Sequence, residues 1–364
     1  MNILIETSFI FESKNIKKLA DGKVSWQSPS NIALVKYWGK TDPQIPKNSS
    51  ISFTLSNCHT KTTLAYTPRS TPSNSFDFQV FFEGEEKTSF RPKIESFFNR
   101  IVDYIPFIRD YKFKIFTENS FPHSSGIASS ASGMSALALC LMSLQRILDP
   151  QLSEFEFLHK ASFLARLGSG SAARSIKGPL VVWGQHPHIK GSSDTFGIPY
   201  PGDIHEVFKT FNDTILLVDK GVKQVSSTVG HNLMLDHPFA DARFSQAQDH
   251  MSKIVPILKN GDLESFIKIV EKEALSLHAM MMCSDPYFIL MKPNTLEIIE
   301  RIWNFRKTSG THICFTLDAG ANVHVLFPEK DQELVHNFIQ SELLRFCENK
   351  QFIHDKVGNG SIAI

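Results

Sequence analysis

A chain of 364 residues is longer than one compact core usually serves, which predicts two lobes. A hydrophobic fraction of 42% and a charged fraction of 21% argue against a disordered or fibrous protein. Lys and Arg number 38 against 37 Asp and Glu, so no overall field attracts nucleic acid or anionic lipid, and an anionic substrate needs local cations.

In the first half of the chain, alternating hydrophobic residues predict strands, and hydrophobic residues at helical spacing predict helices. Ser153, with Glu156 three residues later, fits the N-cap and capping box of one helix. The expected strands cover residues 24–36, 51–56, 62–67, 76–82, 112–117 and 180–183, and the expected helices cover residues 93–105, 129–148 and 153–167.

Residues 184–202 are rich in Gly, Pro, His and Ser and form the best linker candidate. Strands and helices mix without a regular βαβ rhythm, which predicts an α+β fold in two lobes, residues 1–205 and residues 206–364. Beyond the linker, the expected strands cover residues 214–218, 312–317 and 323–327, and the expected helices cover residues 244–259, 263–281, 294–307 and 331–347.

The five cysteines are scattered, without a C-x-x-C pair or a Cys/His cluster. Neither a disulfide framework nor a structural zinc site is therefore expected. Free cysteines are consistent with a location in the reducing cytoplasm. The N-terminal residues carry an early acid and no basic flank before an apolar run, which argues against a signal peptide. The most apolar stretch, residues 134–142, is far shorter than the roughly 20 residues that a membrane span needs and predicts a buried helix.

Residues 121–133 read Phe-Pro-His-Ser-Ser-Gly-Ile-Ala-Ser-Ser-Ala-Ser-Gly and join a predicted strand to a predicted helix. Small residues let the backbone approach a polyphosphate, and the free N–H groups at the helix start favour anions. The hydroxyls of Ser129 and Ser130 can add contacts to phosphate or Mg²⁺. Taken alone, the segment is better explained as a Ser-rich loop with an N-cap, because such short patterns recur by chance.

A second glycine- and serine-rich turn occupies residues 166–175, Arg-Leu-Gly-Ser-Gly-Ser-Ala-Ala-Arg-Ser. Arg174 follows this turn, and its planar fork matches the two oxygens of a carboxylate. The alternative is a glycine turn that ends a helix beside a surface arginine. Two separate anion-friendly turns in a chain of near-neutral charge favour the functional interpretation.

Two further positions carry candidate chemistry at the ends of predicted strands. Lys36 follows an apolar run, and Tyr37, Trp38 and Lys40 come directly after it. Asp318 leaves a buried strand at a turn of small residues, where a general base facing a cleft can be placed. A solvated lysine and an Asx turn are the plainer explanations of these two positions.

Together, these segments resemble the diphosphomevalonate decarboxylase family, within the superfamily of galactokinase, homoserine kinase, mevalonate kinase and phosphomevalonate kinase. The family-like stretches occur in the family's order and spread from near residue 28 to near residue 327. They are Asn-Ile-Ala-Leu-Val-Lys-Tyr-Trp-Gly-Lys at 31–40, Asn-Ser-Ser-Ile-Ser-Phe-Thr-Leu-Ser at 48–56, residues 119–133, Gly-Ser-Gly-Ser-Ala-Ala-Arg-Ser at 168–175, Val-Ser-Ser-Thr at 225–228 and Phe-Thr-Leu-Asp-Ala-Gly at 315–320.

The resemblance implies a two-lobed α+β small-molecule kinase fold with ATP, Mg²⁺ and substrate in the cleft between lobes. The first lobe would carry the ATP phosphate loop and the second lobe the catalytic Asp. ATP would phosphorylate the 3-hydroxyl of 5-diphosphomevalonate, and loss of that phosphate and CO₂ would give isopentenyl diphosphate. The protein would thus be a cytoplasmic lyase of isoprenoid biosynthesis in the mevalonate pathway. Its expected partners are small molecules, and neither nucleic acid nor a membrane is expected. Whether the chain forms a homodimer is an open question.

Each matched residue takes a role from the resemblance. Asp318 would orient or deprotonate the 3-hydroxyl, Lys36 would support the ionised state of Asp318, and Arg174 would hold the substrate carboxylate. Tyr37 and Lys40 would meet the 5-phosphates, and Ser169 and Ser171 the mevalonate part. The ATP phosphates are assigned to Asn119, Ser125, Gly126, Ser129 and Ser130, with Ser130 also contacting Mg²⁺.

The chain departs from the family pattern at three places. The phosphate loop often reads Thr-Ala-Ala where this chain has His-Ser-Ser at residues 123–125. Many members have Gly-Met where this chain has Gly230 and His231, and some bacterial members carry Arg at the position of Thr228. With Thr228 at this position, the expected preference for a 5-diphosphate substrate is less secure than the expected reaction type.

Three alternatives stay open. A phosphomevalonate decarboxylase would use the 5-monophosphate with the same chemistry. A mevalonate 3-kinase would stop after phosphorylation, which Asp318, Lys36 and Arg174 together disfavour. A catalytically silent ligand sensor on the same fold would be favoured by a lost base or a disrupted phosphate loop, and neither is seen.

Overall fold

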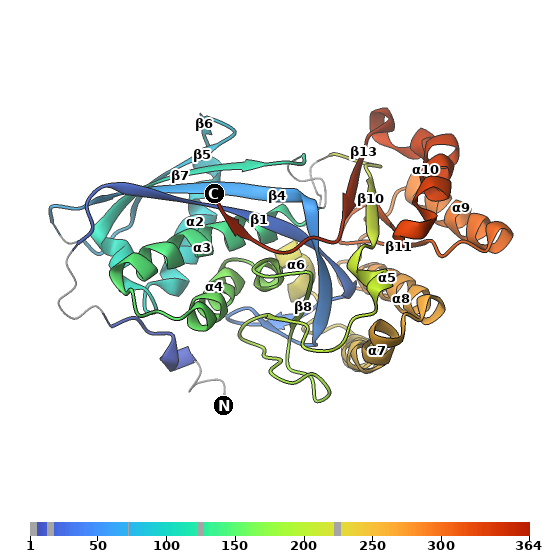
Figure 1. The fold of residues 1–364 in the computed structure, drawn as a ribbon, viewed down its shortest axis with the longest axis horizontal. Helices are drawn as coiled ribbons and strands as arrows, with labels where there is room; N and C mark the ends of the chain where they lie inside the picture. Colours follow the sequence, from blue (N-terminus) through green and yellow to red (C-terminus); the bar gives the residue numbers. More distant parts are fainter. Residues whose placement is uncertain (1–5, 13–17, 72, 123–126, 222–226) are drawn as a thin grey trace.

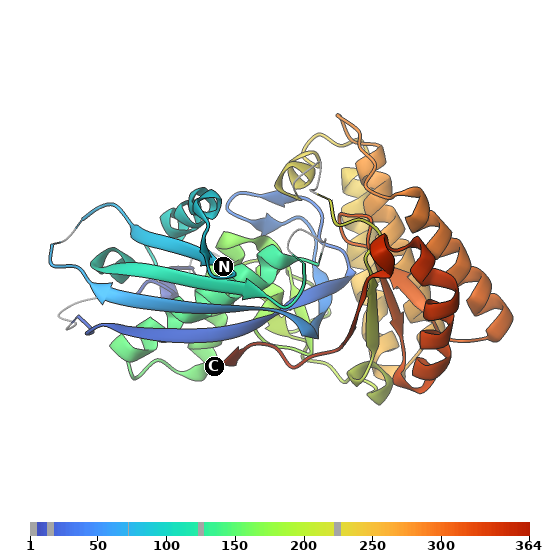
Figure 2. The same cartoon turned by 90° about the horizontal axis from the view of Figure 1, so that it is seen from above.

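A computed structural model of the chain describes residues 6–12, 18–71, 73–122, 127–221 and 227–364. The chain forms two lobes side by side (Figure 1). A large sheet with its helices on one face makes the first lobe, and a four-stranded sheet with a group of helices makes the second. Figure 2 shows the two lobes from above, with the strands of the large sheet running along the length of the first lobe.

The large sheet has the strand order β14-β1-β4-β7-β5-β6, and β8 and β9 extend it from β4. Neighbouring strands are antiparallel except for β5 and β7, which are parallel. A separate short hairpin, β2 (Lys40–Thr41) with β3 (Ile45–Pro46), follows the first strand. The sheet strands are β1 (Gly22–Val35), β4 (Ser50–Pro68), β5 (Asp77–Phe82), β6 (Glu85–Glu86), β7 (Tyr111–Asn119), β8 (Leu180–Trp183), β9 (Ile198–Pro199) and β14 (Ile362–Ala363).

The two strands expected at 51–56 and 62–67 are one long strand, β4. Its pairing with β1 shifts register near Pro29, opposite residues 55–58. At that irregularity the backbone N–H groups of Ser56, Asn57 and Cys58 all donate to the carboxylate of Asp355. A side chain from near the end of the chain thus supplies the acceptors that the partner strand does not, and the strand continues through the bulge.

Three helices cover one face of the large sheet: α2 (Arg91–Ile101), α3 (Ser129–Leu148) and α4 (Glu154–Gly168). The bounds of α3 agree with the predicted helix. By length and composition α3 could cross a membrane, yet 72% of its most apolar window is buried inside the protein. The predicted capping box of α4 is confirmed, because the Ser153 hydroxyl accepts from the Glu156 N–H and the Glu156 carboxylate accepts from the Ser153 N–H.

The second lobe is built on an antiparallel sheet of order β11-β12-β10-β13. Its strands are β10 (Asn212–Leu216), β11 (Cys314–Thr316), β12 (Val323–Phe327) and β13 (Phe352–Lys356). Its helices are α5 (Glu206–Lys209), α6 (Ser227–Asn232), α7 (Ala240–Asn260), α8 (Leu263–Met282), α9 (Pro293–Ser309) and α10 (Gln332–Phe338).

The stretch proposed as a linker lies against the first lobe. β9 pairs with β8, Thr195 is fully buried, and the Arg166 guanidinium donates to the Thr195 carbonyl at 2.7 Å. Its Gly and Pro residues therefore serve tight turns within a packed region. The lobes share a hydrophobic core, in which Phe53 of β4 contacts Phe211 and Phe266 of the second lobe.

The helix expected over residues 331–347 is broken after Phe338. The backbone widens into a π-helical turn at Ile339–Leu343 and then tightens at Leu344–Phe346. Val335, Ile339 and Leu343 are all fully buried. Residues four apart share one face of a helix, so these three side chains stay in the core although the helix type changes along the segment.

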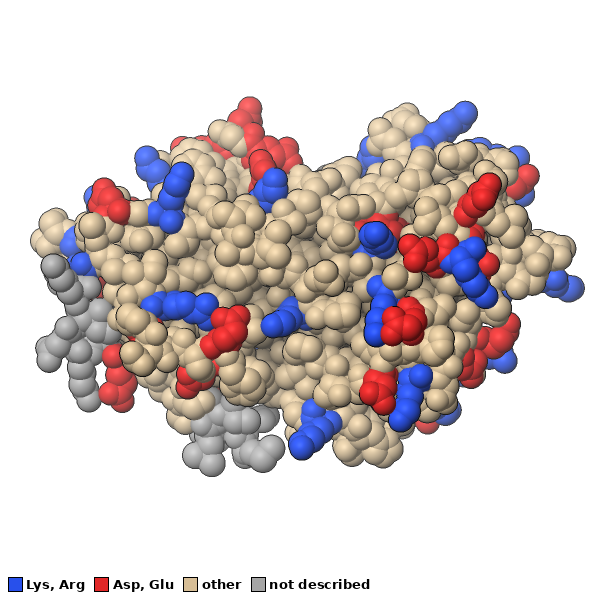
Figure 3. Space-filling model, in the orientation of Figure 1, with Lys and Arg blue, Asp and Glu red and all other residues tan. Residues whose placement is uncertain are grey.

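The end of the chain returns to the first lobe. After β13, the chain crosses back, and β14 pairs with β1 through Trp26 and Ala363. The second lobe is therefore connected to the first at both of its ends, a connection visible in Figure 1. On the face drawn in Figure 3, basic and acidic side chains of the described residues are interspersed, as the net charge of +1 suggests.

Candidate active site

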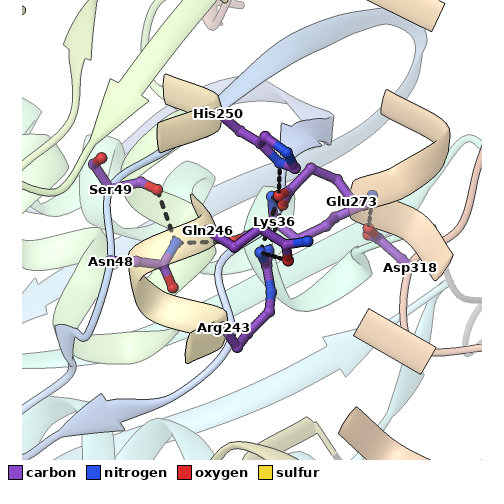
Figure 4. Close-up of polar contacts among 8 residues, drawn as sticks. All are labelled: Lys36, Asn48, Ser49, Arg243, Gln246, His250, Glu273 and Asp318. Carbon is purple, nitrogen blue, oxygen red and sulfur yellow. Dashed lines mark hydrogen bonds and ion pairs between the residues drawn. The ribbon is translucent and has the colours of Figure 1, made fainter. Parts of the chain in front are cut away.

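The centre of the site is an ion pair between the two lobes. Lys36 follows β1, and Asp318 follows β11 with one residue between. Lys36 Nζ lies 2.9 Å from Asp318 Oδ1, and the two side chains point toward one another in Figure 4. Lys36 is buried, whereas 27% of the Asp318 side chain is exposed. Burial lowers the pKa of Lys36 from its ordinary value, and the charge of Asp318 opposes that shift.

The main chain of Lys36 is held by a buried carboxylate from α8. Glu273 accepts the Lys36 backbone N–H at 2.7 Å, and Asn48 donates to the Lys36 carbonyl at 2.9 Å. Arg243 and His250 of α7 bond the two oxygens of Glu273 (Figure 4). Burial opposes ionisation of Glu273, but the hydrogen bond from His250 and the charge of Arg243 hold its pKa below the usual value. The carboxylate is therefore charged and fully paired behind Lys36.

The backbone of Asp318 is fixed from the same helix. His278 of α8 lies 3.1 Å from the Asp318 carbonyl, which can only accept, so Nε2 is the protonated nitrogen. Burial lowers the pKa of His278 to about 4, which keeps the ring neutral. Helix α8 thus supports both members of the central ion pair, through Glu273 and His278.

Arg174 lies in the turn after α4, in the 3₁₀ segment Gly170–Ser175, and is 3% exposed. Its Nε donates to the Ser52 hydroxyl at 2.6 Å and its Nη1 to the Ser50 hydroxyl at 2.7 Å, both on β4. Burial lowers its pKa to about 10, so the guanidinium stays charged at neutral pH. Among the described residues its hydrogen-bond partners are these two hydroxyls, and a buried cation without a paired carboxylate there is suited to receive an anion from the cavity.

The remaining predicted substrate residues lie around the same space. Lys40 Nζ donates to Gln44 Oε1 at 2.9 Å, and the Tyr37 hydroxyl is buried without a hydrogen-bond partner among the described residues. Ser169 lies 3.2 Å from Ser130 through their hydroxyl oxygens. Between Ser169 and Ser171, Gly170 has no room for a side chain, because a Cβ there would lie 2.8 Å from Trp183 and 2.9 Å from the Tyr37 oxygen.

Only part of the residues predicted to bind ATP line the cavity. Ser130 faces the cavity, and Ser129 begins α3 without lining it. Asn119 ends β7 and accepts the Thr60 hydroxyl at 2.8 Å, away from the cavity lining. Ser125 and Gly126 lie outside the described residues, as do residues 225 and 226 of the expected Val-Ser-Ser-Thr stretch.

One cavity of about 250 Å³ collects the predicted catalytic and substrate residues. Among its described lining residues, Asp318 is the one carboxylate, against the cations of Lys36, Lys40, Lys93 and Arg174. Only Lys36 of these four has a carboxylate within 4 Å among the described residues. The cavity is therefore cationic although the chain is nearly neutral, which suits an anionic substrate. Its polar lining consists of Lys36, Tyr37, Lys40, Gln44, Lys93, Ser130, Ser169, Ser171, Arg174, His231 and Asp318.

The motifs did not point to the residues that support the ion pair. Glu273, Arg243 and His250 lie inside long helices and carry no motif. One signal was present, because Glu273 falls on the apolar face of its helix, four residues after Ile269 and four before Leu277. A lone acid on such a face is rarely buried unless it is paired. His231 also lines the cavity, and no motif assigns it a role.

A two-lobed α+β fold with a cationic cavity between lobes, an Asp–Lys pair and a serine-rich helix start defines the small-molecule kinase class. Comparison with known proteins narrows this class. The family described as "Diphosphomevalonate decarboxylase-like N-terminal domain" matches residues 28–195, and the "Mevalonate 5-diphosphate decarboxylase C-terminal domain" matches residues 214–361. The chain belongs to the diphosphomevalonate decarboxylase family.

Individual relatives agree with this membership. The chain is 29% identical over 341 residues to the diphosphomevalonate decarboxylase of Gibberella zeae, covering 87% of this chain and 85% of the relative. The mevalonate diphosphate decarboxylase structure from Staphylococcus aureus matches with a TM-score of 0.80 at 27% identity, covering 94% and 98% of the chains. The structure "MDDEF in complex with MVAPP, AMPPCP and Magnesium" matches with a TM-score of 0.79 at 27% identity, covering 95% and 99%.

Proposed function

We propose that the protein catalyses the ATP-dependent decarboxylation of 5-diphosphomevalonate to isopentenyl diphosphate, ADP, phosphate and CO₂. The observation that carries the proposal is the ion pair of buried Lys36 with Asp318, which shares one cationic cavity with Arg174. Family membership supports the reaction type, and relatives across nearly the full length of the chain bear the decarboxylase name.

In the first step, Asp318 accepts the proton of the substrate 3-hydroxyl as the oxygen bonds the γ-phosphorus of ATP and the bond to ADP breaks. Lys36 keeps Asp318 ionised before the transfer. In the second step, the C3–O bond breaks and phosphate leaves. The C1–C2 bond then supplies the electron pair of the C2–C3 alkene, and C1 departs as CO₂. Arg174 holds the carboxylate for this loss through its planar fork.

The nucleotide phosphates are assigned to the start of α3, with Ser129 and Ser130 as hydroxyl donors. Among the described residues, no group of three His, Cys, Asp or Glu side chains could hold a metal ion by itself. Mg²⁺ commonly takes most of its ligands from phosphates and water, with one or two protein oxygens. The Ser130 hydroxyl and Asp318 carboxylate line the same cavity and fit that need. When bound with ATP, the ion would neutralise charge on the transferring phosphoryl group.

The test is an assay of purified protein with ATP and Mg²⁺. CO₂, ADP and inorganic phosphate are followed with 5-diphosphomevalonate, 5-phosphomevalonate and mevalonate as separate substrates. We expect CO₂ and phosphate in equal amounts from the diphosphate. Release of both products from the monophosphate alone would reassign the substrate. ADP without CO₂ from every substrate would show a 3-kinase, and no turnover with any of them would contradict an enzyme of this class.

A further inference from the structure

His231 of α6 has no role in the steps above, yet it lines the cavity. Its ring lies between two aromatic rings, with centroid distances of 4.3 Å to Tyr37 and 4.5 Å to Trp38. The residue is 8% exposed, and Gly230 before it has no room for a Cβ, which would lie 2.6 Å from Trp38. The orientation of the ring is therefore restricted by its packing against Tyr37 and Trp38.

The proton position on this ring follows from one hydrogen bond. The backbone N–H of Gly39 lies 3.0 Å from His231 Nδ1. An amide N–H can only donate, so Nδ1 is the acceptor and the ring proton sits on Nε2. Burial, with the charges of Lys40 and Arg174, lowers the His231 pKa to about 3. The ring is a neutral donor at any pH at which the protein would work.

The Nε2–H group makes no hydrogen bond to another of the described residues, while its residue lines the cavity. Two further donors line the same cavity. Among the described residues, the buried Tyr37 hydroxyl has no hydrogen-bond partner, and the Lys40 ammonium donates to the neutral Gln44. Asp318, the one carboxylate among the described lining residues, is already paired to Lys36. Such a group of donors suits the oxygens of a phosphoryl group.

We propose that His231 is a specificity-determining residue, whose Nε2–H donates to a phosphoryl oxygen at the 5-position of the substrate. The inference rests on the proposed function and assigns that function's phosphate end to the space beside Tyr37 and Lys40. A neutral donor held in place before binding adds a directed hydrogen bond without adding charge to an already cationic cavity. The contact also favours substrates that carry a 5-phosphate over those that end in a hydroxyl.

Two amide substitutions separate this role from the others that His231 could have. In His231→Asn the side-chain oxygen can take the place of Nδ1 and keep the Gly39 bond, but the Nε2–H donor is lost. In His231→Gln the amide nitrogen can take the place of Nε2, and the Gly39 bond is lost instead. Each variant therefore removes one of the two hydrogen-bonding groups of His231, the donor in one case and the acceptor in the other, and the two new side chains are similar in polarity.

Binding of 5-diphosphomevalonate to each variant is measured by calorimetry, with mevalonate as the ligand that lacks the phosphates. We expect Kd for the diphosphate to rise about tenfold or more in His231→Asn, as for a lost hydrogen bond to a charged group, and less than about threefold in His231→Gln. Affinity for mevalonate changes in neither variant. Because the ring is neutral, the ratio between variants stays constant from about pH 6 to pH 9.

Three outcomes would overturn the assignment. The reverse order of the variants would make the ring an anchor for Gly39, and equal losses would make it packing alone. Unchanged affinity in both variants would remove the contact altogether. Thermal melting of each variant shows whether it is folded, and Gln keeps the test valid if Asn unfolds the site. Failure of the proposed function is seen separately, since the unsubstituted protein would then neither bind nor turn over any phosphorylated mevalonate.

Discussion

Lys36 and Asp318 come from different lobes, yet Lys36 Nζ lies 2.9 Å from Asp318 Oδ1. The ion pair exists only when the strand ends of β1 and β11 lie side by side, which the shared core of the lobes enforces. The catalytic arrangement therefore depends on lobe packing as much as on the residues themselves.

Asp318→Asn tests the base. The amide keeps the shape and the contact with Lys36 but cannot accept the substrate proton, so kcat should fall about 10²–10⁴-fold. The dissociation constant of ATP should change little, because the nucleotide is assigned to α3. Steady-state kinetics with both substrates varied, together with ATP binding, measure the two effects. A variant that keeps more than about a tenth of kcat would remove Asp318 from this role.

Glu273→Gln tests the electrostatic support of Lys36. The pKa of Lys36 is already lowered by burial, and the charge of Glu273 opposes that shift. Lys36 supports Asp318 as a cation, so kcat/KM should fall as pH rises through the Lys36 pKa. Removing the Glu273 charge lowers this pKa further and should move the alkaline limb of the kcat/KM profile to lower pH. Loss of the Arg243 pairing should also lower the free energy of unfolding by about 3 kcal/mol or more.

Glu271→Gln is the matched control for this pH profile. Glu271 lies on the same helix and pairs with Arg306 at 2.6 Å, on a face that does not contact Lys36. It should lose stability while its alkaline limb stays in place. If both variants move the limb equally, the shift comes from general destabilisation and the assignment of Glu273 is wrong.

Arg174→Lys separates charge from geometry at the carboxylate clamp. The ammonium keeps the charge but loses the fork that bonds Ser50 and Ser52, and such a change is not conservative. We expect kcat/KM for the phosphorylated mevalonate to fall at least about tenfold, or roughly 1.4 kcal/mol, with a smaller change for ATP. Arg91→Lys, at an exposed position outside the cavity, should leave both values unchanged. Equal kinetics in the two variants would place the clamp elsewhere.

Ser130→Ala tests the phosphate-binding start of α3. The structure shows no side-chain hydrogen bond capping α3, and the Ser130 hydroxyl meets Ser169 instead. Ser130→Ala should therefore weaken ATP binding and slow phosphoryl transfer with little change in Tm. Ser153→Ala gives the contrast, because Ser153 caps α4, and its loss should cost about 1 kcal/mol of stability with normal kinetics. Normal ATP kinetics in Ser130→Ala would reject the assignment.

How far the sequence predicts this molecule differs from one feature to the next. The bounds of α3 and of β12 follow from hydrophobic spacing alone, because both elements are apolar and sharply delimited. Strand β13 was missed, since Phe352–Lys356 places charged and imidazole groups among few apolar residues. Strand β13 joins the sheet by pairing with β10, whose residues are more than a hundred positions away in the chain. Local sequence patterns do not indicate such a long-range contact.

The same division holds at the site. Lys36, Arg174 and Asp318 lie in recognisable sequence motifs, and all three line one cavity in the structure. Glu273 and His231 act through neighbours from other parts of the chain, so single-sequence patterns gave them no role. The catalytic and binding roles of all these residues stay predictions until the variants are measured.

The return of the last strand to β1 has a mechanical consequence. The second lobe is tied to the first by two covalent crossings, one before α5 and one between β13 and β14. A movement of the second lobe relative to the first therefore has to be accommodated at both crossings and in the hydrophobic core that the lobes share. These constraints together limit how far Asp318 can move away from Lys36.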